Sequence, residues 1–204
     1  MGVMSRSESK SNFQLRGRVV FFATNNVNKF NEARRILAPY NIAVGMLRVK
    51  ALEIQSDSLQ EIAETSVVDA FKRSHLPMLV EDAGLFIEGL NGFPGPYAAY
   101  VYKTIGNKGL IELVQNVKTR KAHFESAVAY MSGDLKSPLI FSGKVQGKIA
   151  LVERRGDGDS GFGFDPIFEP GTSNKTFAEM SVTQKNKFSH RAQAFRAFAE
   201  WYKA

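Results

Sequence analysis

The pattern of hydrophobic and polar residues in the first half of the chain predicts alternating strands and helices. β-branched and aromatic residues fill Arg18–Ala23, which indicates a buried strand. Apolar residues at helical spacing predict a helix over Lys29–Ala38, and a second strand is expected over Asn41–Leu52. Ser58 and Glu61 form an S-x-x-E capping box, and the helix that begins there carries its apolar residues on one face. This order of elements predicts a mixed α/β fold.

The second half of the chain changes from helical to strand periodicity. Met78–Val80 is expected to be a short strand that ends in an acidic glycine turn, and Gly84–Gly95 is expected to be an irregular loop. A short amphipathic helix is expected over Lys108–Asn116. Alternating apolar and polar residues then predict an antiparallel unit of three strands, at residues 124–131, 139–145 and 147–153.

The two ends of the chain differ in character. Ser189 is placed to cap a last helix, which is expected to bury Ala192, Phe195, Phe198, Ala199 and Tyr202. Residues 1–16 are rich in Ser, Lys, Arg and Asn and have few apolar anchors, which is typical of a flexible basic tail. Residues 17–204 contain neither an internal repeat nor a linker, so we expect them to form one domain.

Composition places this domain among globular proteins. Of the 204 residues, 44% are hydrophobic and 23% are charged, which allows a real core. The absence of cysteine excludes disulfides and thiolate metal sites, and it allows a reducing compartment, so the cytoplasm is the expected location. Since the sequence has no run of about 18 apolar residues and no apolar signal segment, no membrane association is expected.

The net charge of +7 admits two classes of anionic partner. Residues 1–18 contain four basic residues and one acidic residue, so nearly half of the excess lies in or beside the expected tail. The modest remainder fits an enzyme for a polyanionic small molecule as well as it fits a nucleic-acid-binding module. A nucleic-acid module predicts Lys and Arg clustered on one face, whereas here they are scattered, and no stable nucleic-acid partner is expected.

Two junctions between a strand and a polar loop carry the candidate chemistry. At the first, the Thr24 hydroxyl, the amides near Asn25 and Asn26 and the Lys29 ammonium lie at a helix N-terminus, where they can hold a triphosphate. The G-x-x-x-x-G-K-[ST] phosphate loop is absent, and an Asn-rich helix cap with a solvated lysine is the plain alternative.

The second junction supplies adjacent carboxylates, Glu81 and Asp82. Because neighbouring side chains of a strand point to opposite faces, only one of the two can face a given cleft. Glu53 and Asp82 are a candidate Mg²⁺ pair, since hard cations take oxygen ligands and bridge to substrate phosphates. The plain alternative is an ordinary strand end with solvated acidic side chains.

Two further segments contain candidate base-binding residues. Phe162, Phe164 and Asp165 make a plausible pocket, because aromatic rings stack on purines and a carboxylate accepts from ring N–H groups, although such phenylalanines also occur as core. His190 and Arg191 follow Ser189 at a helix start, where a capping serine and surface residues are the alternative. Three histidines and no cysteine argue against zinc, and no nucleophile elbow supports a Ser-His-Asp triad.

Together these segments resemble the inosine triphosphate pyrophosphatase family, the non-standard purine NTP pyrophosphatases. They occur in family order from about residue 18 to the C-terminus, and although each is weak alone, seven in order are specific. The segments that carry the resemblance are Thr24–Lys29 with Glu32, Leu52–Ile54, Val80–Leu85, Gly92–Tyr97, Gly163–Pro166, Phe177–Met180 and Lys185–Arg191.

The resemblance implies hydrolysis of ITP, dITP and XTP between the α and β phosphorus atoms, which gives the monophosphate and pyrophosphate and cleanses the nucleotide pool. It implies Mg²⁺ held by Glu53 and Asp82, and catalytic roles for Asp82 and Lys29. The substrate-binding residues that it implies are Thr24, Asn25, Asn26, Lys29, Ala83, Phe162, Gly163, Phe164, Asp165, Lys185, His190 and Arg191.

The implied fold is an elongated α/β structure with a curved mixed sheet, two lobes and a cleft between them, usually as a homodimer. Two departures from the family pattern stand out. Asn25 replaces a usual glycine, which is tolerable because Asn visits positive φ, and Ala99 stands where relatives often have Ser or Lys. The nearest rival enzyme is the septum-inhibition type of nucleotide pyrophosphatase, and the ending Ser189–Arg191 argues against it.

Overall fold

The protein is described by a computed structural model that covers residues 18–203 except 50, 53, 157–160 and 172. Within these residues the chain forms a seven-stranded mixed sheet with helices on both faces, so the expected mixed α/β fold is confirmed. The strands are β1 (Arg18–Ala23), β2 (Ile42–Leu47), β3 (Met78–Ile87), β4 (Pro94–Gly95), β5 (Lys121–Met131), β6 (Leu139–Ile149) and β7 (Phe168–Pro170).

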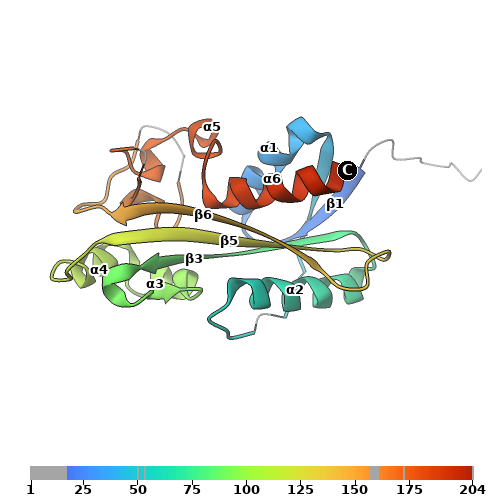
Figure 1. The fold of residues 1–204 in the computed structure, drawn as a ribbon, viewed down its shortest axis with the longest axis horizontal. Coiled ribbons are helices and arrows are strands. Elements are labelled where there is room, and N and C mark those ends of the chain that lie inside the picture. The colour runs from blue at the N-terminus through green and yellow to red at the C-terminus, as the bar shows by residue number, and fades with distance from the viewer. Residues whose placement is uncertain (1–17, 50, 53, 157–160, 172, 204) are drawn as a thin grey trace, which may run out of the picture.

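The helices surround this sheet. The α-helices are α1 (Val27–Leu37), α2 (Leu59–Ser74), α3 (Ala98–Thr104), α4 (Gly106–Leu113), α5 (Val182–Lys185) and α6 (His190–Lys203). Short 3₁₀ helices are η1 (Ala38–Tyr40), η2 (Glu88–Leu90), η3 (Asp165–Ile167) and η4 (Phe177–Glu179). Figure 1 shows α1 and α6 on one side of the sheet and α2 on the other, with α3 and α4 near the end of β3.

The edge of β3 that faces β1 is only partly covered by other strands. The strand order is β2-β1-β3-β5-β6-β7, and β4 pairs with β3 off this path. β5 pairs with β3 from Met78 to Ile87, so β1 and β4 must share the opposite edge. There β1 reaches only Leu79, and β4 begins its pairing at Leu85. Residues 80–84 of β3 therefore have one edge between two strands, which leaves room for side chains from α1.

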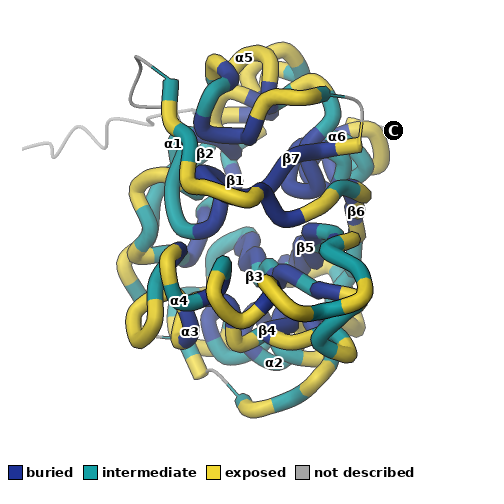
Figure 2. The backbone as a smooth tube through the Cα atoms, turned by 90° about the vertical axis from the view of Figure 1, so that its left-hand side faces the viewer, coloured by how far each residue is buried: buried dark blue, intermediate teal, exposed yellow. Residues whose placement is uncertain are grey.

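Three hydrophobic clusters fill the interior. Because side chains alternate along β3, Leu79 packs with α1 and α6, whereas Val80 packs with α2. A third cluster joins the end of β3 to α3, α4, η3 and η4. Figure 2 shows the buried stretches gathered in the middle of the molecule and the exposed ones on the outer loops.

Helix α6 confirms the predicted C-terminal helix. Its expected core residues Ala192, Phe195, Phe198 and Ala199 are fully buried, and Tyr202 is half-buried. β6 presents a glycine where α6 begins: a Cβ on Gly143 would lie 2.1 Å from the carbonyl oxygen of His190. The missing side chain allows the start of α6 to lie directly on the sheet, and this places His190 and Arg191 inside the protein.

The expected acidic turn after Val80 and the irregular loop that begins at Gly84 are wrong, because β3 continues to Ile87. The strand continues because β5 pairs with it along its whole length. Gly84 marks a close approach of two strands, since a Cβ there would lie 2.7 Å from the carbonyl oxygen of Gly95 in β4. The glycine at position 84 is therefore required by the neighbouring strand β4 and does not mark a turn.

Other predicted boundaries also change. The strands expected at 139–145 and 147–153 are one strand that ends at Ile149, and Gly147 lies inside it because β7 approaches closely there. β2 ends at Leu47, and α4 ends at Leu113. The tail expected over residues 1–16 lies outside the described residues, so its separation from the domain stays a prediction.

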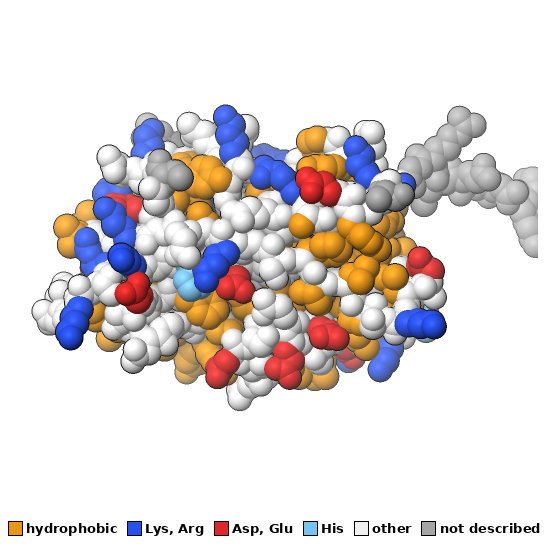
Figure 3. Space-filling model, in the orientation of Figure 1, with side chains coloured by type: hydrophobic (Ala, Val, Ile, Leu, Met, Phe, Trp, Pro, Cys, Tyr) orange, Lys and Arg blue, Asp and Glu red, His pale blue; other side chains and the backbone are white. Residues whose placement is uncertain are grey.

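The surface gives two more findings. On the face seen in Figure 3, Lys and Arg side chains lie at several separate places with acidic side chains between them. No helix of the described ranges is both long enough and apolar enough to cross a membrane.

Candidate active site

The first polar junction is a well-formed helix cap. The Asn26 side chain accepts hydrogen bonds from the backbone N–H groups of Asn28 (3.0 Å) and Lys29 (3.1 Å), and Thr24 Oγ1 accepts from Asn26 N (3.1 Å). The plain alternative of an Asn cap is therefore confirmed for Asn26. Asn25 is exposed beside it. The phosphate-binding role of these residues stays a prediction.

Lys29 is not the solvated lysine of that alternative. Its Nζ lies 2.9 Å from Glu81 Oε2 and 3.3 Å from the Glu81 carbonyl oxygen, and its side chain is 19% exposed. The ammonium thus occupies the section of the β3 edge that neither β1 nor β4 covers. Helix α1 delivers a cation to the point where β3 carries its two carboxylates.

Those two carboxylates face opposite sides of the sheet, as strand alternation predicts. Glu81 is buried on the side of α1 and α6, where Ser126 Oγ donates to it at 2.7 Å. Asp82 is half-buried on the side of α2, because its strand neighbour Val80 and its cross-strand partner Ala127 belong to the cluster under that helix. Ala83 follows on the same face as Glu81 and is half-buried.

Glu81 stays ionised in the interior. Burial alone would raise the pKa of its carboxyl group, but the charges of Arg191 and Lys29 and the hydrogen bond from Ser126 outweigh burial. The pKa is therefore held well below its ordinary value. Arg191 Nε lies 3.1 Å from Glu81 Oε1, and Arg191 as a residue is 2% exposed.

A second set of ion pairs lies beside the first. Lys185 Nζ is 2.9 Å from Glu32 Oε1 and 2.7 Å from Asp165 Oδ2, and Arg191 lies 2.7 Å from the other oxygen of Glu32. Burial would lower the pKa of Lys185, but Asp165 and Glu32 outweigh it and raise the pKa. The backbone N–H of Phe162 donates to Asp165 Oδ2 at 2.9 Å, which ties the preceding loop to this pair.

These ion pairs form one continuous group with three cations and three carboxylates, so its formal charges balance. All its members except Lys29 are nearly or fully buried. We call it the six-charge network, and it consists of Lys29, Glu32, Glu81, Asp165, Lys185 and Arg191.

The two candidate stacking residues differ in environment. The centroid of the Phe162 ring lies 4.9 Å from Lys185 Nζ and 5.3 Å from Arg191 Cζ, so the ring covers two of the three cations of the network. Phe164 is 3% exposed in the hydrophobic core, with Tyr102 against it at 5.4 Å. The core alternative therefore describes Phe164. Gly163 between them has φ of 59°, a conformation that glycine adopts without strain.

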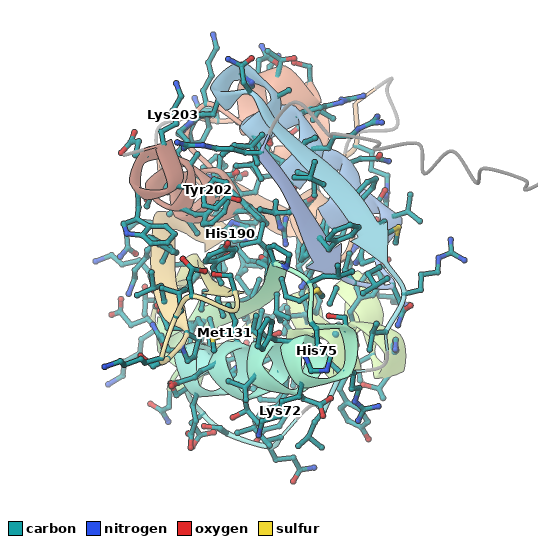
Figure 4. All side chains as sticks on the ribbon, turned by 90° about the vertical axis from the view of Figure 1, so that its right-hand side faces the viewer. Lys72, His75, Met131, His190, Tyr202 and Lys203 are labelled. Carbon is teal, nitrogen blue, oxygen red and sulfur yellow. The ribbon has the colours of Figure 1, made fainter. Side chains whose placement is uncertain are left out.

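His190 is a neutral, buried ring next to the network. It is 2% exposed and stacks on Phe124 with centroids 4.7 Å apart. Burial, reinforced by the charges of Arg191 and Lys185, lowers its pKa well below the ordinary value. Its Nδ1 has no hydrogen-bond partner among the described residues. Figure 4 shows His190 in the interior on the α6 side of the sheet, whereas His75 lies at the end of α2.

The predicted metal pair is only partly visible, because Glu53 lies outside the described residues. Within the described part of the chain, no group of three His, Cys, Asp or Glu side chains is arranged to hold a metal ion. A set of two carboxylates, Glu53 and Asp82, still fits Mg²⁺, which keeps several waters and takes further oxygens from phosphates. The donor chemistry is thus compatible with magnesium and unsuited to a closed zinc site.

The structure adds Ser126 to the candidate site and gives contacts to Glu32 and Glu81, which the sequence named without a role. Glu32 lies in a helix three residues after Lys29 and is buried, and a charge next to the apolar face of a helix is a signal for this. Ser126 occupies an inward position of β5 between Phe124 and Val128, where a polar residue also indicates a buried partner. A cavity of about 800 Å³ lies elsewhere, and no member of the network lines it.

Comparison with known proteins gives one consistent result. Residues 20–201 match the sequence model of the Ham1 family. A dITP/XTP pyrophosphatase of Thermococcus kodakarensis is 50% identical over 182 residues, which cover 89% of this chain and 96% of that protein. A dITP/XTP pyrophosphatase of Methanopyrus kandleri is 48% identical over 184 residues, which cover 90% of this chain and 96% of the relative.

The fold is also similar to solved structures. A HAM1 protein from Coxiella burnetii matches with a TM-score of 0.79 at 28% identity, over 91% of this chain and 98% of that one. The sheet and its helices are thus shared at low sequence identity.

Proposed function

The chain belongs to the Ham1 family, and we propose that it hydrolyses the non-standard purine nucleoside triphosphates dITP, XTP and ITP to the monophosphate and pyrophosphate. Relatives named dITP/XTP pyrophosphatase, which match about nine-tenths of the chain, support this substrate class. The observation that carries the proposal in this chain is the six-charge network. In this proposal Lys29, at one end of the network, binds phosphates, and Lys185 and Arg191, at the other end, bind the base.

At the phosphate end, Lys29 and Asp82 have separate tasks. Lys29 reaches the uncovered edge of β3 and neutralises charge that gathers on the pyrophosphate leaving group. Asp82, which follows Glu81 in β3, orients a water in line with the α-phosphorus and accepts a proton from that water. Thr24, Asn25 and Asn26 position the triphosphate at the start of α1.

We assign Mg²⁺ to Glu53 and Asp82. When bound, the ion would supply positive charge that offsets the negative charge of the phosphates. This assignment accounts for an Asp82 carboxylate that points away from the buried network, toward the α2 side of β3.

At the base end, fixed donors select a 6-keto purine. Lys185 and Arg191 are held protonated by buried carboxylates, so they can only donate to the base. The Phe162 ring offers the stacking face, with Gly163 and Asp165 shaping the loop, while Phe164 and His190 form the wall behind it. The amino group of adenine would face these donors and leave buried polar groups unpaired. We therefore expect kcat/KM to be lower for ATP than for ITP.

Two wider features complete the proposal. The protein acts as a homodimer in the cytoplasm, where it cleanses the nucleotide pool. It forms no stable complex with nucleic acid and does not associate with a membrane. The oligomeric state is directly testable by sedimentation of the purified full chain.

The activity is tested with purified protein, Mg²⁺ and a panel of ITP, XTP, dITP, ATP, GTP and UTP, with pyrophosphate and phosphate detected separately. We expect pyrophosphate from the first three nucleotides and little from ATP. Turnover of UTP in preference to ITP would favour the pyrimidine-type nucleotide pyrophosphatase. Salt-sensitive DNA binding without turnover would favour the nucleic-acid module.

Replacement of the proposed base gives the sharpest single test. We expect Asp82→Asn to lower pyrophosphate release from ITP by about 10²- to 10⁴-fold, because it removes the proton acceptor, while circular dichroism stays unchanged. Asp134→Asn is the matched control, since Asp134 lies in the β5–β6 turn and bonds only locally to Ser132. Full activity of the Asp82 variant would contradict the mechanism.

A further inference from the structure

Two carboxylates join the phosphate end of the proposed site to its base end. Glu81 Oε2 lies 2.9 Å from Lys29 Nζ and 3.5 Å from Arg191 Nη2, and Glu81 Oε1 lies 3.1 Å from Arg191 Nε. Glu32 uses one oxygen for Arg191, at 2.7 Å, and the other for Lys185, at 2.9 Å. Arg191 is thus clamped between them, and an unbroken line of contacts runs from Lys29 to Lys185.

Burial makes these contacts interdependent. Glu32 is 6% exposed and Glu81 also 6%, so neither carboxylate can exchange a lost partner freely for water. When a phosphate takes Lys29, Glu81 loses one cation and attracts Arg191 more strongly. Arg191 Nη1 would then be released from Glu32 and could donate to the base, while Glu32 keeps its contact with Lys185.

We propose that Glu32 and Glu81 are positioning residues that couple phosphate binding at Lys29 to base recognition at Lys185, with Arg191 as the group they share. Neither carboxylate touches the substrate in this proposal, which rests on the proposed function for the assignment of the two ends. The consequence is that a base is recognised most strongly when a polyphosphate is bound.

The coupling is measured with one probe for each end: inosine for the base end and inorganic tripolyphosphate for the phosphate end. Full-length protein at constant Mg²⁺ is titrated with inosine, with and without saturating tripolyphosphate, by calorimetry. In the unaltered protein we expect tripolyphosphate to tighten inosine binding at least about fivefold, which is the lower range of measured couplings between sites. In Glu32→Gln and Glu81→Gln the ratio falls to within about twofold.

Glu169→Gln is the matched control. Glu169 is also nearly buried and also pairs with two cations, Lys148 at 3.1 Å and Arg154 at 2.7 Å, but it lies on β7 outside the network. We expect this variant to keep the full coupling ratio. A loss of coupling in Glu169→Gln as large as in Glu32→Gln would overturn the proposal, because the effect would then be a general loss of rigidity.

A second variant keeps the test decisive if a glutamine variant folds poorly. Lys29→Met removes the partly exposed cation through which the phosphate end acts on Glu81, so we expect the coupling to be lost while inosine alone still binds. Independent binding of the two probes to the unaltered protein would overturn the coupling and leave the proposed function standing. Absence of pyrophosphate release from ITP, dITP and XTP would overturn the proposed function itself.

Discussion

Lys185 keeps its charge in the interior because two carboxylates and two aromatic rings surround its ammonium group. The residue is 1% exposed, and its Nζ lies 4.9 Å from the Phe162 ring and 5.3 Å from the Phe177 ring. A buried charge of this kind depends on its partners, and the partners depend equally on it. Each of the five buried members of the six-charge network is therefore costly to remove alone.

Replacement of Lys185 tests this dependence. Lys185→Met leaves the carboxylates of Glu32 and Asp165 with one cation fewer, and we expect a loss of about 3–5 kcal/mol in the free energy of unfolding. Urea denaturation measures the loss. Lys148→Met is the control, since Lys148 also pairs with a carboxylate but its side chain is 56% exposed, and we expect about 0–1 kcal/mol there. Equal losses in the two variants would contradict the interpretation.

Residue by residue, the sequence predicts types of environment better than partners. Strand alternation placed Glu81 and Asp82 on opposite faces, and the structure confirms it. The partners of Glu81 were not predicted: it contacts Lys29 and Arg191 directly. The partner of a buried carboxylate is chosen by elements far along the chain, and local pattern carries no information about it.

Helix α6 depends on the surface that β6 presents to it. The apolar spacing from Ala192 to Ala199 predicted the buried face of this helix correctly, because a period of 3.6 residues is a local property. What the helix packs on is not local. Gly143 lies 47 residues before His190, and its missing side chain sets how closely α6 begins to the sheet.

A larger residue at this contact tests the packing. A Cβ at position 143 would lie 2.1 Å from the His190 carbonyl oxygen and 2.7 Å from the Ala194 nitrogen, so backbone must move. We expect Gly143→Ala to cost about 1–3 kcal/mol and to lower kcat/KM for ITP, because Arg191 moves with the start of α6.

Gly133→Ala is the control for that experiment, because the nearest atom to its added Cβ is a flexible ring carbon of Phe71 at 4.0 Å. Thermal melting and pyrophosphate release are measured for both variants. If Gly143→Ala melts and turns over ITP like the Gly133 variant, α6 does not need the close approach and this account of its position is wrong.

Strands show the same division between local and distant causes. The alternation in β5 was predicted correctly, whereas β3 was predicted to end at Val80 and continues to Ile87. A glycine inside a strand and a glycine in a turn give the same local signal. They differ in what lies beside them, here Gly95 of β4, and only the folded chain supplies that neighbour.

At the scale of the whole molecule, the candidate site is assembled from distant segments. Glu32 and Lys185 are 153 residues apart in the sequence, and Glu81 and Arg191 are 110 apart. The order of the motifs predicted the family, and the family match is confirmed over residues 20–201. It did not predict that the base-end cations are paired with carboxylates from α1 and β3, because that arrangement exists only in three dimensions.

The buried groups His190, Glu32 and Glu81 determine how the free energy of unfolding depends on pH. The pKa of His190 is lowered well below 6.5, mainly by burial, so the unfolded chain binds a proton there before the folded one does. Its contribution to stability is present above about pH 6.5 and is lost as the pH falls toward the folded pKa. The lowered pKa values of Glu32 and Glu81 act in the same direction at lower pH, below about 4.5.

Replacement of His190 separates the effect between pH 6.5 and 5 from the effect below about pH 4.5. Between pH 6.5 and 5 we expect the free energy of unfolding to fall by up to about 1.4 kcal/mol per pH unit, the limit for one proton. His190→Phe keeps the stacked ring on Phe124 without a titrating group, so its slope in this window is shallower, while its decline below about pH 4.5 remains. Urea denaturation at half-unit pH steps measures both slopes.

His123→Phe is the comparison, because His123 is partly exposed and its pKa is lowered by burial to a lesser degree. An unchanged slope in His190→Phe would show that the folded protein and the unfolded chain protonate His190 over the same pH range, and the lowered pKa of His190 would then be wrong.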